Sequence, residues 1–102
     1  DLMGVKLAFW SFRKKVWDTR KCETLPYMED FTCDQLYFIS SAATYCSTLT
    51  PDTFLSNLNN GVHCPPRVRV NEAVRNFEVF NKIFKCNKPK SGSKRSSCDL
   101  WK

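Results

Sequence analysis

Six cysteines and one histidine are the residues of this chain whose chemistry is most distinctive. His63 stands directly before Cys64, and a cysteine beside a histidine can act as a nucleophile when its thiol is free. The cysteines are even in number, however, and their wide, irregular spacing is typical of a disulfide framework in an oxidising compartment. We therefore expect three disulfides, with no free thiol left over, among Cys22, Cys33, Cys46, Cys64, Cys86 and Cys98.

Other catalytic and metal-binding patterns lack the residues they need. With one histidine, the chain can form neither the HExxH motif nor a two-histidine site of the ribonuclease type, and it contains no CxxC pair. Glu29 and Asp30 adjoin in a segment that also holds Glu23, but neighbouring acids in a loop are typical of solvated surface. The sequence predicts no enzymatic activity, no metal and no cofactor.

Charge is unevenly distributed along the chain, whose overall net charge is +6. Residues 1–21 carry a net charge of +4, and residues 67–102 carry +7. Residues 22–66 contain no lysine or arginine and carry −5. Two basic ends therefore flank an acidic middle, a polarisation that favours encounter with an acidic partner surface.

Local signals for a helix start are clearest in the middle of the chain. Thr32 and Gln35 match a capping box and predict a helix from about Cys33 to Ser47. Further along, Thr50 is suited to the N-cap and Pro51 to the first helical position. We expect this short third helix to end just before a glycine, Gly61.

Apolar residues at helical spacing predict the first and last helices. A helix from about Leu2 to Arg20 would carry an apolar stripe of Val5, Phe9, Phe12 and Val16. Paired prolines keep the segment before Asn71 extended, although its alternating RVRV could also form a short strand. From Asn71 to about Cys86, a fourth helix would direct inward Ala73, Val74, Phe77, Phe80, Ile83 and Phe84.

These elements predict an all-α fold, a small disulfide-stapled bundle of about four helices that occupies residues 1–102 as a single secreted domain. The second and fourth helices would terminate at the same end of the bundle, which favours a disulfide between Cys46 and Cys86. Residues 86–102 form a basic loop or tail. Cys98 would anchor it by reaching back toward Cys22, Cys33 or Cys64, because twelve residues span roughly 3.3 Å each when extended.

A basic face results if the two basic ends adjoin. On the first helix, Trp10 and Trp17 alternate with bases, and Trp and Arg are common in binding hot spots. The same rings could instead pack on neighbouring helices, and the lysine-rich tail could serve solubility alone. We predict that the partner-binding residues are Lys6, Arg13, Lys14, Arg20, Lys21, Lys88, Lys90, Lys94, Arg95 and Trp101.

Location is predicted from the cysteines and from the absence of an apolar run of 18 or more residues. We expect a secreted, extracellular, mature chain that is monomeric and does not insert into membranes. Its expected partner is an extracellular protein with an acidic surface, or a sulfated glycosaminoglycan, and not a nucleic acid.

Basic charge, six cysteines in about a hundred residues, a helical pattern and the lack of catalytic residues together resemble the small salivary effectors of blood-feeding insects, including sand-fly anti-complement proteins. That resemblance implies a complement inhibitor or an inhibitor of haemostasis: a non-enzymatic protein that obstructs an extracellular protease cascade, complement or coagulation, by protein binding. Two alternatives stay open. One is a cytokine- or hormone-like helical ligand of a receptor, and the other is a heparin-binding or other polyanion-binding protein.

Overall fold

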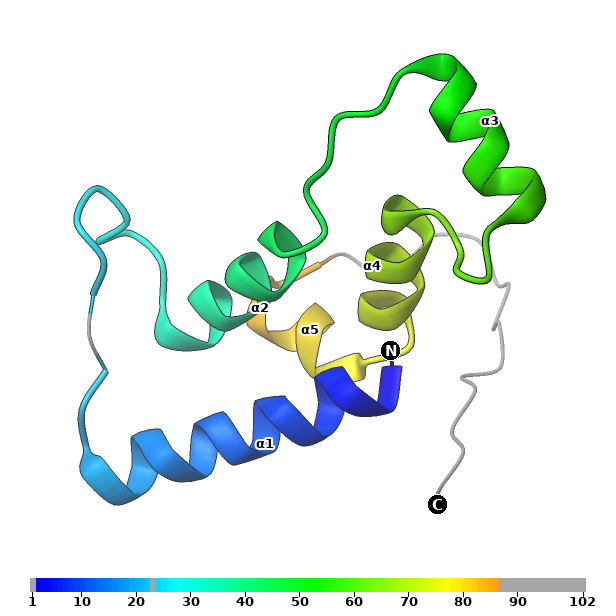
Figure 1. Cartoon of the computed structure of the whole chain (residues 1–102). Coiled ribbons are helices and arrows are strands. Elements are labelled where there is room, and N and C mark those ends of the chain that lie inside the picture. The colour runs from blue at the N-terminus through cyan, green and yellow to red at the C-terminus, as the bar shows by residue number, and fades with distance from the viewer. Residues whose placement is uncertain (1, 23, 87–102) are drawn as a thin grey trace.

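A computed structural model of the chain describes residues 2–22 and 24–86 (Figure 1). All regular secondary structure in these residues is helical and none is a strand, so the predicted all-α class is confirmed. RVRV is therefore helical. The elements in chain order are α1 (Leu2–Thr19), α2 (Cys33–Ala43), α3 (Pro51–Asn60), α4 (Pro66–Arg75) and α5 (Glu78–Ile83).

Three phenylalanines, one each from α1, α2 and the α4–α5 junction, form the centre of the core. Phe9 is fully buried, and its ring centroid lies 5.1 Å from that of Phe38 and 5.5 Å from that of Phe77. Offset and edge-on rings at these distances add to the burial of apolar area. Around them pack Val5, Tyr37, Val74, Val79, Phe80, Ile83 and Phe84. Five of these were predicted as apolar positions of the first and last helices.

The predicted start of α2 is confirmed in detail. The Thr32 hydroxyl accepts a bond from the Gln35 backbone N–H at 3.3 Å, and the Gln35 side chain accepts one from the Thr32 N–H at 2.9 Å. The helix ends at Ala43, sooner than predicted, because the next backbone N–H groups bond carbonyls three residues back in a tight turn. There the Thr44 hydroxyl also donates a hydrogen bond to the Ser41 carbonyl at 2.8 Å.

The predicted single helix from Asn71 to Cys86 is wrong, because two helices stand in its place. The first of them starts already at Pro66, whose fixed φ suits the first helical position. Continuation past Arg75 is interrupted where the Asn76 side chain donates to the Glu72 carbonyl at 2.8 Å. Phe77 then adopts an extended backbone and places its ring in the core before α5 begins.

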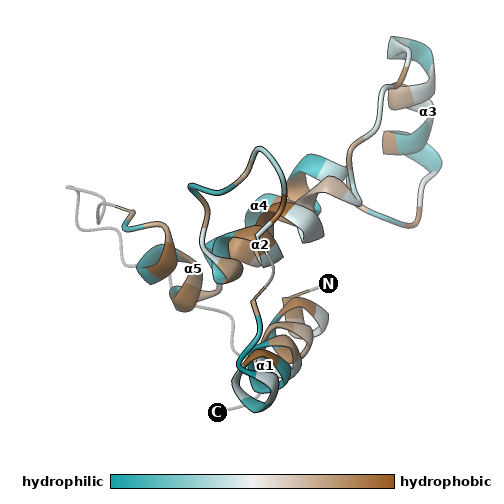
Figure 2. Ribbon diagram, turned by 90° about the vertical axis from the view of Figure 1, so that its left-hand side faces the viewer, coloured by the Kyte–Doolittle hydropathy of each residue, from teal (hydrophilic) through white to brown (hydrophobic). Residues whose placement is uncertain are grey.

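α3 has the predicted bounds and cap but stands away from the rest of the molecule (Figures 1 and 2). The contacts that hold the fold join α1 with α2 and α4, α2 with α5, and α4 with α5. None of the ten residues of α3 is buried. The bundle is therefore built from the other four helices.

One disulfide is present among the described cysteines, and it joins Cys22 to Cys33 with 6.1 Å between their Cα atoms. Cys46, Cys64 and Cys86 are free and exposed, so the expectation of complete pairing and the predicted Cys46–Cys86 bond are both wrong for this part of the chain. The prediction of that bond assumed a continuous helix leading to Cys86, but the helix is interrupted. Cys98 lies outside the described residues.

Candidate functional site

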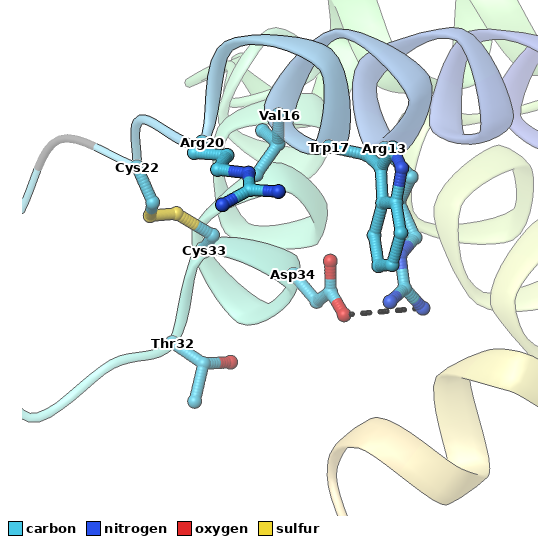
Figure 3. A pocket seen from close by; sticks show the side chains of 8 residues that line it. All are labelled: Arg13, Val16, Trp17, Arg20, Cys22, Thr32, Cys33 and Asp34. Atoms are coloured by element: carbon cyan, nitrogen blue, oxygen red, sulfur yellow. Dashed lines mark ion pairs between the residues drawn. A yellow bond between two sulfur atoms is a disulfide. The ribbon is translucent and has the colours of Figure 1, made fainter.

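A groove between the second half of α1 and the start of α2 gathers part of the predicted basic face (Figure 3). Its volume is about 560 Å³. The Cys22–Cys33 disulfide closes one end and ties the loop after α1 to the first residue of α2. We call it the α1–α2 groove, and it is lined by Arg13, Val16, Trp17, Arg20, Cys22, Thr32, Cys33 and Asp34.

Charge in the groove is partly balanced. The guanidinium of Arg13 lies 3.6 Å from the carboxylate of Asp34, and both side chains keep contact with solvent. Arg13 also lies over the ring of Phe9, at 6.0 Å from its centroid. Because an exposed ion pair of this kind contributes about 0–1 kcal/mol, the pair orients Arg13 more than it stabilises the fold.

Trp17 and Arg20 are two exposed groove residues that a partner could contact. The side chain of Trp17 is 82% exposed. Arg20 has a φ of 50°, a left-handed conformation that ends α1 and turns the chain toward Cys22. No carboxylate among the described residues forms an ion pair with Arg20, which leaves its charge available to an anionic group.

Only two of the ten predicted partner-binding residues, Arg13 and Arg20, lie in the groove. The Lys6 ammonium is directed to the core ring of Phe77, at 5.8 Å, and Lys14 pairs with Asp18 at 2.6 Å. Lys21 lines a second depression, which shares Val16, Cys22 and Cys33 with the groove. The remaining five lie outside the described residues: Lys88, Lys90, Lys94, Arg95 and Trp101.

Sequence reasoning missed Asp34 as a member of the site. Asp34 is distant from Arg13 in sequence, and only the packing of α2 on α1 brings the two together. The sequence offered one weak signal for Asp34: it is an acid in the first turn of a well-capped helix.

The groove presents charged and aromatic side chains that can bind a partner. Its two cysteines are oxidised to a disulfide, and its one carboxylate is engaged by Arg13. The described residues include no group of three or more His, Cys, Asp or Glu that could hold a metal ion. A catalytic zinc takes three protein ligands, and the described residues bring no three such groups together.

Sequence comparison identifies the family. The model of peptidase family M13 matches residues 1–100, so the chain belongs to that family. It is 31% identical to endothelin-converting enzyme 1 of Cavia porcellus over 101 residues, which are 99% of this chain and 13% of that enzyme.

Two further relatives show the same partial coverage. Neprilysin-1 of Caenorhabditis elegans is 33% identical over 104 residues, 99% of this chain and 14% of the relative. Membrane metallo-endopeptidase-like 1 of Homo sapiens is 28% identical over 101 residues, 99% of this chain and 13% of the relative. The chain thus spans about one seventh of the length of these proteins, and no solved structure matches it.

The family corrects several expectations. The resemblance to salivary effectors is wrong, and so is the complement or coagulation inhibitor that it implied, because the whole chain matches a peptidase family. The expectation of a non-enzymatic protein is also overturned. It was based on missing catalytic residues, but a chain that spans 13% of an enzyme need not contain that enzyme's catalytic residues.

The described helices include none that is long and apolar enough to cross a membrane. The Cys22–Cys33 disulfide is typical of proteins that fold in an oxidising compartment. Family and disulfide together support a location outside the cytosol.

Proposed function

We propose that this chain is a portion of an M13 metallopeptidase that completes the fold of the enzyme without holding the catalytic metal. The observation that carries this proposal is the match of residues 1–100 to the family together with a coverage of only 13% of relatives such as endothelin-converting enzyme 1. The reaction of the complete protein is hydrolysis of peptide bonds. This chain supplies packing surface to it.

Two features of the chain support the proposal. The described residues offer no cluster of metal ligands, so the metal belongs to another part of the enzyme. Large apolar side chains are more than half exposed on α1 and α3, among them Trp17, Leu55 and Leu58. Exposed apolar residues gathered on a surface are typical of sites that contact another protein surface.

We further propose that the complete enzyme acts outside the cell, as a secreted or membrane-anchored protein. One relative carries the name membrane metallo-endopeptidase-like 1, and an exposed basic residue such as Arg20 suits contact with an acidic surface. The acidic partner protein or sulfated glycosaminoglycan predicted for the basic face stays a proposal. Within the enzyme, an acidic segment of its own polypeptide would satisfy Arg20 equally well.

The test uses three samples: this chain, the rest of the M13 peptidase from the same source produced separately (the remainder), and the two combined. Cleavage of a fluorogenic peptide is followed with and without a metal chelator. We expect no cleavage by the chain alone, and cleavage by the mixture that exceeds the sum of the separate rates and is abolished by the chelator. Chelator-sensitive cleavage by the chain alone, or no gain on mixing, would overturn the proposal.

A further inference from the structure

α3 is a well-formed helix that packs little against the other described helices. Its N-cap hydroxyl, on Thr50, accepts the Thr53 backbone N–H at 3.3 Å, and the N–H of Gly61 bonds the Asn57 carbonyl at 2.8 Å. No residue of the helix is buried. Because an isolated helix of about ten residues is marginal in water even with good helix formers, α3 needs a further surface to be stable.

One side of α3 is apolar and solvent-exposed. Phe54, Leu55 and Leu58 fall within about 100° of one another around the helix axis and are 43%, 53% and 54% exposed. We call these three the α3 apolar face. Ser56 and Asn60 lie on the opposite side, so the helix has the amphipathic pattern of a surface helix with its apolar side uncovered.

The α3 apolar face continues into a depression between α3, the end of α2 and the start of α4. Its volume is about 600 Å³. Apolar side chains dominate the lining, which includes Leu49, Phe54, Pro66 and Val70, and Arg67 is its one basic residue. A partner would therefore meet a ridge and an adjoining hollow, a shape that permits interlocking side chains.

We infer that the α3 apolar face and this depression are the docking surface for the remainder, the part of the M13 peptidase that this chain does not cover. The inference rests on the proposed function. It is supported by the length of the relatives: about six sevenths of their polypeptide lies outside the match, and the corresponding part of this enzyme would supply the occupant.

Charge adds a constraint on the occupant. α3 carries Asp52 in its first turn and no basic residue. The remainder should therefore present an apolar patch with lysine or arginine near the N-terminal end of α3.

The experiment measures binding of the chain to the immobilised remainder. The test variant is Leu55→Glu with Leu58→Glu, and the matched control is Ser56→Glu with Asn60→Glu on the opposite side of the helix. Both variants add two acids to α3. Since the remainder is expected to be basic here, added acids do not repel it, and a loss of affinity reports lost apolar contact.

We expect the Leu55/Leu58 substitutions to raise Kd by about thirtyfold or more, because two half-exposed leucines no longer become buried on binding. The control substitutions should raise Kd by less than about threefold. Thermal unfolding of the two variants without the remainder should match wild type, because neither pair contacts the core. That second measurement separates lost docking from misfolding.

Each outcome is decisive. If wild type binds and the Leu55/Leu58 variant binds equally well, the docking surface lies elsewhere and only this inference is overturned. If wild type does not bind a remainder that is itself folded, as judged by a cooperative thermal transition, the proposed function fails and the inference with it. If the chain alone sediments as a dimer that the Leu55/Leu58 variant dissociates, the occupant is a second copy of the chain, and docking of the remainder is overturned.

Discussion

At the scale of single residues, stability depends on the phenylalanine cluster far more than on the charged groups. Phe9 is the one described side chain that is both large and fully buried, and it contacts four other rings. Ion pairs such as Arg13–Asp34 and Lys14–Asp18 are exposed and contribute little. Substitutions should therefore differ sharply in effect along the same helix.

Replacement of Phe9 by Ala should lower the free energy of unfolding by about 3–5 kcal/mol, because it leaves a cavity between Phe38 and Phe77. Urea unfolding followed by far-UV circular dichroism measures the change. Trp17→Ala is the control on the same helix and should change it by less than about 0.5 kcal/mol, since the indole is exposed. A loss below about 1 kcal/mol for Phe9→Ala would contradict the assigned core.

Replacement by alanine should have opposite effects on stability at two glycines. A Cβ at Gly61 would lie 2.3 Å from the backbone oxygen of Asn57, so Gly61→Ala must displace the last turn of α3. At Gly4, inside α1, nothing lies within 4 Å, and Gly4→Ala should stabilise the helix by about 0.5–1 kcal/mol. Thermal unfolding of both variants, with amide exchange of residues 57–61, tests the pair, and equal effects would contradict the local geometry.

At the scale of elements, features set by residues close in sequence could be predicted, and features set by tertiary packing could not. The capping residues Thr32 and Thr50 act through bonds to neighbours three positions away, so sequence alone predicted where α2 and α3 begin. The break between α4 and α5 was missed, because the apolar spacing runs through Asn76 unchanged, while the break follows from the Asn76 side-chain bond to the Glu72 carbonyl and from the burial of Phe77 in the core. The solvent-exposed position of α3 was missed for the same reason.

The candidate site shows the same division. Arg13 and Arg20 were predicted from their spacing on one helix, and both lie in the α1–α2 groove. Asp34 and the Cys22–Cys33 bond depend on how α2 approaches α1, which no local pattern records. Composition then suggested a wrong protein class, since basic charge and cysteine number are shared by unrelated proteins.

Alkylation of the native protein without reductant should distinguish the two groups of described cysteines. We expect labelling at Cys46, Cys64 and Cys86, which are exposed thiols, and none at Cys22 and Cys33 until the disulfide is reduced. Peptide mass spectrometry reads the sites. Labelling of Cys22 before reduction, or protection of Cys46 and Cys86 together, would contradict the observed pairing.

Loss of the disulfide should also weaken the α1–α2 connection. Cys22→Ser with Cys33→Ser opens a link between residues separated by 11 in sequence, and we expect a loss of about 2–3 kcal/mol in the free energy of unfolding. Denaturant unfolding measures it. An unchanged midpoint would mean that the helices hold this loop without help.

At the scale of the whole molecule, the chain has a core but leaves one helix outside it. Four helices enclose the phenylalanine cluster, whereas α3 projects from them with Phe54, Leu55 and Leu58 exposed (Figure 1). The chain spans about one seventh of the length of its relatives, and an uncovered helix is what the proposed function predicts. The lack of a metal-ligand cluster among the described residues therefore says nothing against peptidase activity of the complete protein.

Hydrogen exchange of the α3 backbone amides, in the chain alone and combined with the remainder, tests this account most directly. In the chain alone, the amides of residues 54–60 should exchange quickly, because an unpacked helix of this length opens readily, while those around Phe9 and Phe38 stay protected. In the complex, we expect exchange across residues 54–60 to slow by about a hundredfold or more, as for a helix packed in a core. Equal exchange of α3 in both samples, with binding demonstrated, would contradict the claim that the rest of the peptidase covers this helix.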